Sequence, residues 1–219
     1  MTTTNVLVWH LITTSVVKTG KRTFAPPSEQ KLVGVGTLKL TNLPPVFSFF
    51  QSNQEELVIK ELLAEFASVE AKGSVIVSCF GREFGYPVLV SAALRNNTSL
   101  EPYLDKFTDH TKCFDISSWL NWQLKEKPSF DLVTKLMNLP LRPAKDVLAL
   151  IAAKKWKTLR SRLAIDCLIL AFSWLHIQVV TGKLSLARVA KEIKKLTEYY
   201  DNLPGELTKT YLFDLKSPR

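Results

Sequence analysis

The lysines and arginines between residues 142 and 195 are the residues whose types point most directly to a chemistry. This segment holds 12 Lys or Arg and 3 Asp or Glu, whereas the rest of the chain holds 17 of each, so the segment carries the whole net charge of +9. Charge at this density favours binding to a polyanion, because binding releases the counterions of the polyanion. A solvated basic face that keeps the protein soluble would give the same pattern, so charge alone leaves both interpretations open.

Trp156 lies among these cations, with Lys154 and Lys155 before it and Lys157 and Arg160 after it. An indole flanked by lysines can stack on a nucleobase while the ammonium groups hold phosphates. The alternative is a core Trp on an amphipathic helix. A second basic cluster lies mostly on one face of the last predicted helix and comprises Arg188, Lys191, Lys194 and Lys195. Together the two clusters would form a track for a nucleic-acid backbone without sequence readout.

Other reactive side chains form no recognised catalytic pattern. Cys113 lies near His110 in the sequence, but no third group supports this pair as a nucleophile and its base. The three cysteines, at positions 79, 113 and 167, fit neither a zinc site nor a disulfide framework. They predict reduced thiols and a cytoplasmic location. The sequence contains no G-x-S-x-G, Walker or H-E-x-x-H motif.

The elements that must position these residues change character along the chain. Apolar and β-branched runs predict strands over residues 5–17, 31–40, 45–50, 74–79 and 111–115. Apolar stripes at helical spacing predict helices over residues 52–67, 84–95, 117–123, 129–137, 144–157, 160–181 and 185–200. Three strands in hairpin-like succession, then a strand between helices and a helical second half, predict a mixed sheet covered by helices.

Length and hydropathy limit the architecture further. The 219 residues, 46% of them hydrophobic, predict a single domain over residues 1–200 with a C-terminal extension over residues 201–219. The most apolar stretch, residues 163–180, contains Asp166 and His176, which favours a buried helix over a membrane span. The first residues show no basic region followed by an apolar run, so we expect no secretory signal and no membrane association.

Several segments resemble, in order and spacing, the predicted 3′–5′ exonuclease family related to the proofreading domain of B-type DNA polymerases. Residues 77–89, V-S-C-F-G-R-E-F-G-Y-P-V-L, are similar to the family motif V-S-F-N-G-R-G-F-D-L-P-V-L. The places of the motifs F-D-I-E-T, H-x-D-L-x-D, S-L-D-E-L-A-K-L-L-G-L-P and Y-C-E-x-D-V are taken by residues 8–13, 110–115, 130–140 and 162–166. The resemblance covers about residues 5–200. It implies an α/β fold with a ribonuclease-H-like mixed β-sheet flanked by α-helices.

The resemblance also implies a metal centre whose ligands are mostly missing here. The family uses two divalent ions, Mg²⁺ or Mn²⁺, about 4 Å apart, and such hard cations need carboxylate oxygens. His10 and Ile12 stand where the family has its first Asp and Glu, and Gly85 stands at its middle Asp. Only Asp166 matches a family ligand, and Arg162 takes the place of the water-orienting Tyr or His. We therefore expect no bound metal, no other cofactor and no two-metal hydrolysis at this site.

Arg162 and Asp166 are four residues apart, so they would share one helix face and could pair. Such a pair fits a metal site that has become a salt bridge. In the middle of a strand, His10 fits a hydrogen-bonded, half-buried histidine better than a metal ligand. Four other carboxylates have no spacing that forces them into a metal site, namely Glu83, Asp105, Asp109 and Asp115.

These observations predict a catalytically inactive, exonuclease-like domain that binds nucleic acid, either DNA or RNA. The candidate phosphate contacts are Arg82, Lys154, Lys155, Lys157, Arg160 and Arg162. One alternative is a protein-interaction scaffold without a nucleic-acid role, because a fold does not determine a function. The other is a residual metal-dependent 3′–5′ exonuclease with rearranged ligands. A protein partner in a nucleic-acid-processing complex is compatible with the first two interpretations.

Overall fold

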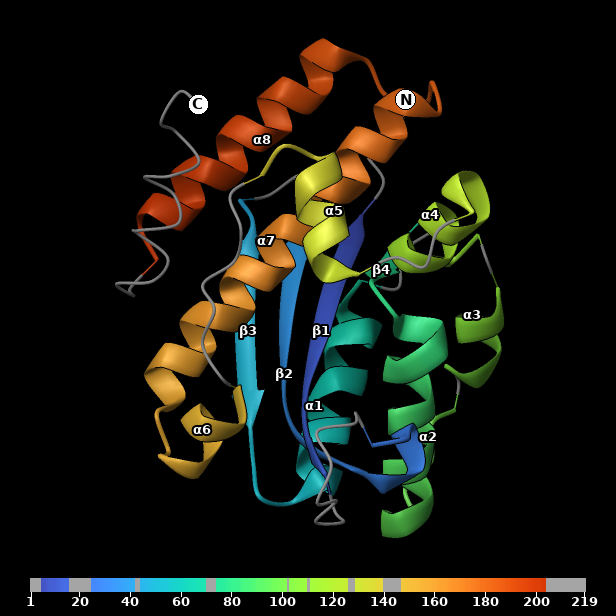
Figure 1. Ribbon diagram of the computed structural model, residues 1–219, viewed down its shortest axis with the longest axis vertical. Coiled ribbons are helices and arrows are strands. Elements are labelled where there is room, and N and C mark those ends of the chain that lie inside the picture. Colours follow the sequence, from blue (N-terminus) through green and yellow to red (C-terminus); the bar gives the residue numbers. More distant parts are fainter. Residues whose placement is uncertain are drawn as a thin grey trace.

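A five-stranded mixed sheet forms the centre of the computed structural model, which describes residues 5–15, 25–41, 44–69, 74–101, 103–109, 111–125, 129–139 and 147–203. The strand order is β3-β2-β1-β4-β5 (Figure 1). Strand β1 (Val6–Ser15) pairs antiparallel with β2 (Gln30–Leu40), and β2 pairs antiparallel with β3 (Val46–Gln51). Strands β4 (Val75–Ser78) and β5 (Cys113–Asp115) continue the sheet parallel to β1. The predicted α/β fold, a mixed sheet flanked by helices, is thus confirmed.

Helices cover both faces of this sheet. Helices α1 (Glu55–Ser68) and α2 (Tyr86–Asn96) pack against β2 on one face, and α7 (Trp156–Val180) packs against β1 and β2 on the other. In Figure 1, α7 runs diagonally in front of β3, β2 and β1, with α1 behind them. Side chains of β1 alternate between the two cores, because successive residues of a strand point to opposite faces. Val8 and Ile12 join the core on the α7 side, and Leu7 and Trp9 join the other.

Helix α7 is buried over most of its circumference, as its apolar sequence predicts. Among the described residues it is the one helix long and apolar enough to cross a membrane, but 83% of its apolar window is buried inside the molecule. Gly182, at φ 70°, follows the end of α7, and Ser185 caps α8 (Leu186–Asp201) by accepting from the Arg188 N–H. Both boundaries agree with the predicted ones. The Tyr200 hydroxyl donates to the Ala164 carbonyl at 2.8 Å and ties α8 to α7.

The helical region before α7 differs from the prediction. A single helix was expected over residues 144–157, but α6 (Val147–Ala152) ends early, and α7 begins at Trp156. Between them Lys154 adopts a left-handed backbone at φ 50°. The boundary between the two helices therefore lies at residues 153–155 and not at residues 158–159, where it was predicted. Residues 140–146 and most of the predicted C-terminal extension lie outside the described residues.

Smaller differences from the predicted elements occur at several points of the chain. A π-helical turn, Gly81–Gly85, precedes α2, which was expected to begin at residue 84. Helix α1 begins at Glu55, three residues later than predicted, and the Ser52 hydroxyl before it accepts from the Gln54 N–H at 3.0 Å. The short η1 (Pro27–Glu29) and α3 (Leu104–Thr108) were not predicted. Helices α4 (Ile116–Leu124) and α5 (Phe130–Leu136) lie where they were expected, and both pack against α7.

Candidate functional site

The structure brings His10, Arg162 and Asp166 together where α7 passes over β1. Asp166 is 3% exposed and Arg162, one turn earlier, is 6% exposed. The Arg162 Nε donates to Oδ2 of Asp166 at 3.3 Å, so the predicted ion pair is present. The His10 Nε2 lies 3.8 Å from the same Oδ2. One carboxylate oxygen therefore faces a guanidinium and an imidazole.

His10 is half-buried, as expected for a histidine in the middle of a strand. Its ring meets the edge of the Phe130 ring, with 5.7 Å between centroids and an interplanar angle of 66°. Phe130 opens α5, and Ser129 caps that helix by accepting from the Leu132 N–H at 3.0 Å. The cap thus fixes where α5 begins and helps to place Phe130 against the imidazole. His10 is held between this aromatic side chain and Asp166.

Ile12 and Gly85, where the resemblance predicts carboxylate ligands, face other groups. Ile12 is 4% exposed and belongs to the apolar core beneath α7. A Cβ built on Gly85 would lie 3.1 Å from the Trp9 ring, so this position faces the indole. Trp9 and His10 point to opposite faces of β1, because side chains alternate along a strand. A side chain at position 85 would therefore start on the side of the sheet away from Asp166.

This donor set does not fit a pair of divalent ions. Mg²⁺ and Mn²⁺ require several oxygen ligands, and Asp166 is the one carboxylate at the four positions where the resemblance places ligands. A buried guanidinium already contacts that carboxylate. Within the ranges that the structure describes, no three His, Cys, Asp or Glu side chains cluster as a metal site would require. Glu83, the acidic residue nearest to Gly85 in the sequence, is exposed.

Asp115 has a structural role, because it holds the turn of residues 81–85 in place. Its Oδ1 caps α4 by accepting from the Ser118 N–H at 2.8 Å. Its Oδ2 accepts from the Ser78 hydroxyl and from the Arg82 N–H, each at 3.2 Å. A Cβ on Gly81 would lie 2.1 Å from the Ser78 Oγ, so only glycine fits at this point of the turn. The β4 end, the π-helical turn and α4 are joined through this one buried carboxylate.

Four of the six candidate phosphate contacts lie close together in the sequence where α7 begins. Lys154, Lys155 and Lys157 are exposed there. Arg160 is half-buried, with its guanidinium carbon 5.8 Å from the centroid of the Phe47 ring on β3. Trp156 is also half-buried and packs against the core, which agrees with the second interpretation of this residue. The first basic cluster is thus an exposed surface beside the edge strand of the sheet.

The other two candidate contacts lie elsewhere. Arg162 is buried in its ion pair with Asp166, so its guanidinium faces the interior. Arg82 is half-buried in the turn after β4, and its Nη2 donates to the Cys113 carbonyl at 3.4 Å. Their positions in the sequence did not distinguish them from the exposed cations, because exposure depends on which elements pack around a side chain.

The cysteines offer no nucleophile. All three are free and buried. Burial raises the pKa of Cys113 to about 12, and the nearby Arg82 guanidinium lowers it only in part. A thiol with this pKa carries almost no thiolate at neutral pH, and the thiolate is the nucleophilic form. His110, its neighbour in the sequence, lies outside the described residues.

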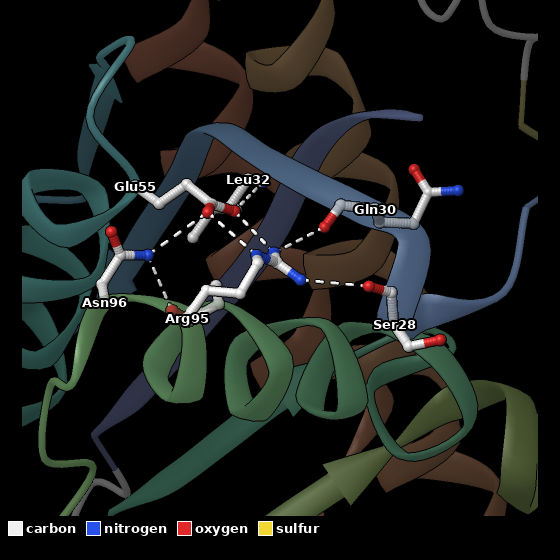
Figure 2. Close-up of polar contacts among 7 residues, drawn as sticks. Ser28, Gln30, Leu32, Glu55, Arg95 and Asn96 are labelled. Atoms are coloured by element: carbon white, nitrogen blue, oxygen red, sulfur yellow. Dashed lines mark hydrogen bonds and ion pairs between the residues drawn. The ribbon is translucent and has the colours of Figure 1, made fainter. Parts of the chain in front are cut away.

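A polar cluster around the buried Glu55, shown in Figure 2, was not predicted from the sequence. The Arg95 guanidinium donates to both Glu55 carboxylate oxygens, at 2.8 and 3.2 Å, and to the carbonyls of Gln30 and Ser28. Glu55 also accepts from the Leu32 N–H at 2.7 Å. The cluster joins the start of α1, the end of α2 and the start of β2. Its members are far apart in the sequence, so no local signal pairs them.

Comparisons with known proteins give one family match. Residues 22–214 match the model of a family described as predicted 3′–5′ exonuclease related to the exonuclease domain of PolB. No curated protein matches the chain. A solved structure titled "ExoI/SSB-Ct complex" is similar over 80% of this chain and 44% of that chain, with a TM-score of 0.41 and 12% sequence identity. This chain thus spans less than half the length of that one. The family match begins after β1, so the position of His10 beside Asp166 comes from the structure alone.

Proposed function

Because the chain belongs to the family of predicted 3′–5′ exonucleases related to the exonuclease domain of PolB, we propose that it is a catalytically inactive member that binds nucleic acid. The Arg162–Asp166 ion pair carries this proposal. The last carboxylate of the family's metal centre is engaged with an internal cation. The second part of the proposal rests on the exposed cations where α7 begins.

The ion pair opposes metal binding for an electrostatic reason. A divalent ion at Asp166 would lie next to the Arg162 guanidinium, which is always charged. Displacing that guanidinium would leave it buried without its carboxylate, which is costly in a low-dielectric interior. Ile12 and Gly85 supply no side-chain oxygen that could compensate. Two-metal hydrolysis, which needs both ions held close together, therefore has no support at this site.

The same changes favour the binding of phosphates. Loss of three acidic ligands removes negative charge from the site around Asp166. Lys154, Lys155 and Lys157 add exposed positive charge where α7 begins, and Arg160 lies one turn further along the helix. These cations can hold a nucleic-acid backbone without reading its sequence. Binding without cleavage is the result that we propose.

Inactivity is tested with end-labelled single-stranded DNA and RNA incubated with Mg²⁺ or Mn²⁺. We expect no shortening by the wild-type protein or by Asp166→Asn. Metal-dependent shortening that disappears in Asp166→Asn would contradict the proposal and favour an exonuclease with rearranged ligands. Shortening that persists in the variant would indicate a contaminating nuclease, since Asp166 is the one family ligand that remains.

Binding is tested by salt titration of two matched double variants. Lys155→Ala/Lys157→Ala removes two exposed cations of the basic cluster, and Lys60→Ala/Lys112→Ala removes two exposed lysines elsewhere. The first variant should lower the slope of log affinity against log salt by about 1.4 on single strands, at about 0.7 per phosphate contact. The second should leave it unchanged. Absence of any affinity at low salt would contradict nucleic-acid binding and favour a protein-interaction scaffold.

A further inference from the structure

Trp122 is an exposed indole that the fold does not use. It is 67% exposed, whereas Trp9 and Trp174 are buried and the remaining two tryptophans are half-buried. Leu120, two residues earlier and about 200° round the helix, is buried. Trp119 is half-buried and packs against the same core. Helix α4 therefore keeps its apolar contacts through other residues and presents Trp122 to solvent.

A cation lies over the Trp122 ring. The Lys125 Nζ is 5.9 Å from the ring centroid. Lys125 ends α4 in a left-handed conformation at φ 57°, and its N–H donates to the Asn121 carbonyl. This turn of the backbone brings the ammonium back toward the indole. An ammonium over an indole is attracted by the negative face of the ring.

Helix α4 lies on the α7 side of the sheet, where Ile116 and Leu120 join the core that α7 forms. Asp115, which caps the start of α4, also accepts from the Arg82 N–H in the turn of residues 81–85. Both α4 and α5 pack against α7, which carries Asp166, and Phe130 of α5 contacts His10. In Figure 1, α4 and α5 both lie in the upper half of the molecule.

We propose that Trp122 and Lys125 form a stacking site for one unpaired base of a single-stranded nucleic acid. This inference rests on the proposed function and adds the form of the bound strand. The indole supplies a flat apolar surface, and the Lys125 ammonium complements the adjacent phosphate. Stacking of this kind tolerates any base, because every base has a π-face. Paired bases inside a duplex are already stacked on their neighbours, so a duplex offers no free base to stack on the Trp122 indole.

The test compares Trp122→Ala with Trp122→Phe and with Leu94→Ala, a control that truncates another highly exposed apolar side chain, on α2. Anisotropy titrations use labelled oligothymidylate, an abasic strand of the same length and a duplex. Trp122→Ala should weaken binding of oligothymidylate by at least about 5-fold, the lower end for one stacked base. Trp122→Phe should retain most of the affinity, and the control should retain all of it. Affinity for the abasic strand and the duplex should not change.

Three results would overturn the stacking site. If Trp122→Ala binds oligothymidylate like the wild type, the stacking site is wrong although the proposed function stands. Equal losses on the intact and abasic strands would mean that Trp122 does not act through a base. If the wild type binds none of the three probes at low salt, both proposals fail. Lys125→Ala adds an independent check, since it should lower the single-strand salt slope by about 0.7.

Discussion

Replacing Arg162 by methionine tests how much the buried Arg162–Asp166 ion pair contributes to the stability of the protein. Arg162 and Asp166 are almost fully buried and 3.3 Å apart. The variant leaves the Asp166 carboxylate inside the protein without its guanidinium. Breaking a buried pair in this way costs about 3 to 5 kcal/mol. For a chain of this length, that corresponds to a decrease in Tm of about 6 to 20 °C. Methionine keeps much of the apolar stem, so the loss reports mainly the charge.

The assay is urea denaturation at neutral pH, followed by circular dichroism, with thermal scans in parallel. The double variant Arg162→Met/Asp166→Leu should recover most of the loss, because apolar replacement of a buried pair is often neutral or stabilising. A loss below about 1 kcal/mol for Arg162→Met alone would refute the reasoning, since it is well under the cost expected for a broken buried pair. Neither Mg²⁺ nor Mn²⁺ should raise the Tm of the wild type, although a bound ion would do so by mass action. A metal-dependent rise that disappears in Asp166→Asn would identify Asp166 as a metal ligand.

Two further predictions concern the scaffold around the site. Burial raises the pKa of Glu55, but hydrogen bonds from Arg95 and from the Leu32 N–H outweigh burial and hold the pKa below its ordinary value. The hydrogen bonds of Glu55 should therefore stabilise the fold when the pH is above the ordinary carboxyl pKa, and this contribution should be lost as the pH falls through the lowered pKa of Glu55. The free energy of unfolding of Glu55→Gln, measured by urea titration, should lack this dependence on acid pH. Gly81→Ala should destabilise the protein by about 1 to 3 kcal/mol or more, because its Cβ would overlap the Ser78 hydroxyl. Gly182→Ala, which meets no atom within 4 Å, should show only the smaller cost of its positive φ in the same denaturation assay.

Much of the fold was predictable because its signals are local. The alternation of apolar residues in β1 and the compact apolar run of β4 specify strands whatever their partners are. The Ser185 cap and Gly182 mark the boundary between α7 and α8 for the same reason. The break at Lys154 was predicted at residues 158–159 instead, because a left-handed residue other than glycine leaves no reliable mark in the sequence.

The candidate site was predictable only where its members are neighbours in the sequence. Arg162 and Asp166 are one helical turn apart, so spacing alone predicted their pairing. Exposure was not predictable in the same way. Arg162 and Lys155 were both predicted to contact phosphate, yet Arg162 is buried and Lys155 is exposed. Trp122 was not predicted as a functional residue, because its exposure follows from the orientation of α4.

The sequence by itself determined the kinds of elements, their order, the location of the basic segment and the absence of carboxylates at three positions where the resemblance predicts them. These properties are carried by residue identity and by short periodic patterns. The tertiary structure alone decided that His10 meets Asp166, that Gly85 faces Trp9, and that Glu55 and Arg95 meet between α1 and α2. Such contacts join residues that are distant in the chain, and they depend on how α7 crosses the sheet and how the helices pack. That packing is a property of the whole chain and not of any segment within it.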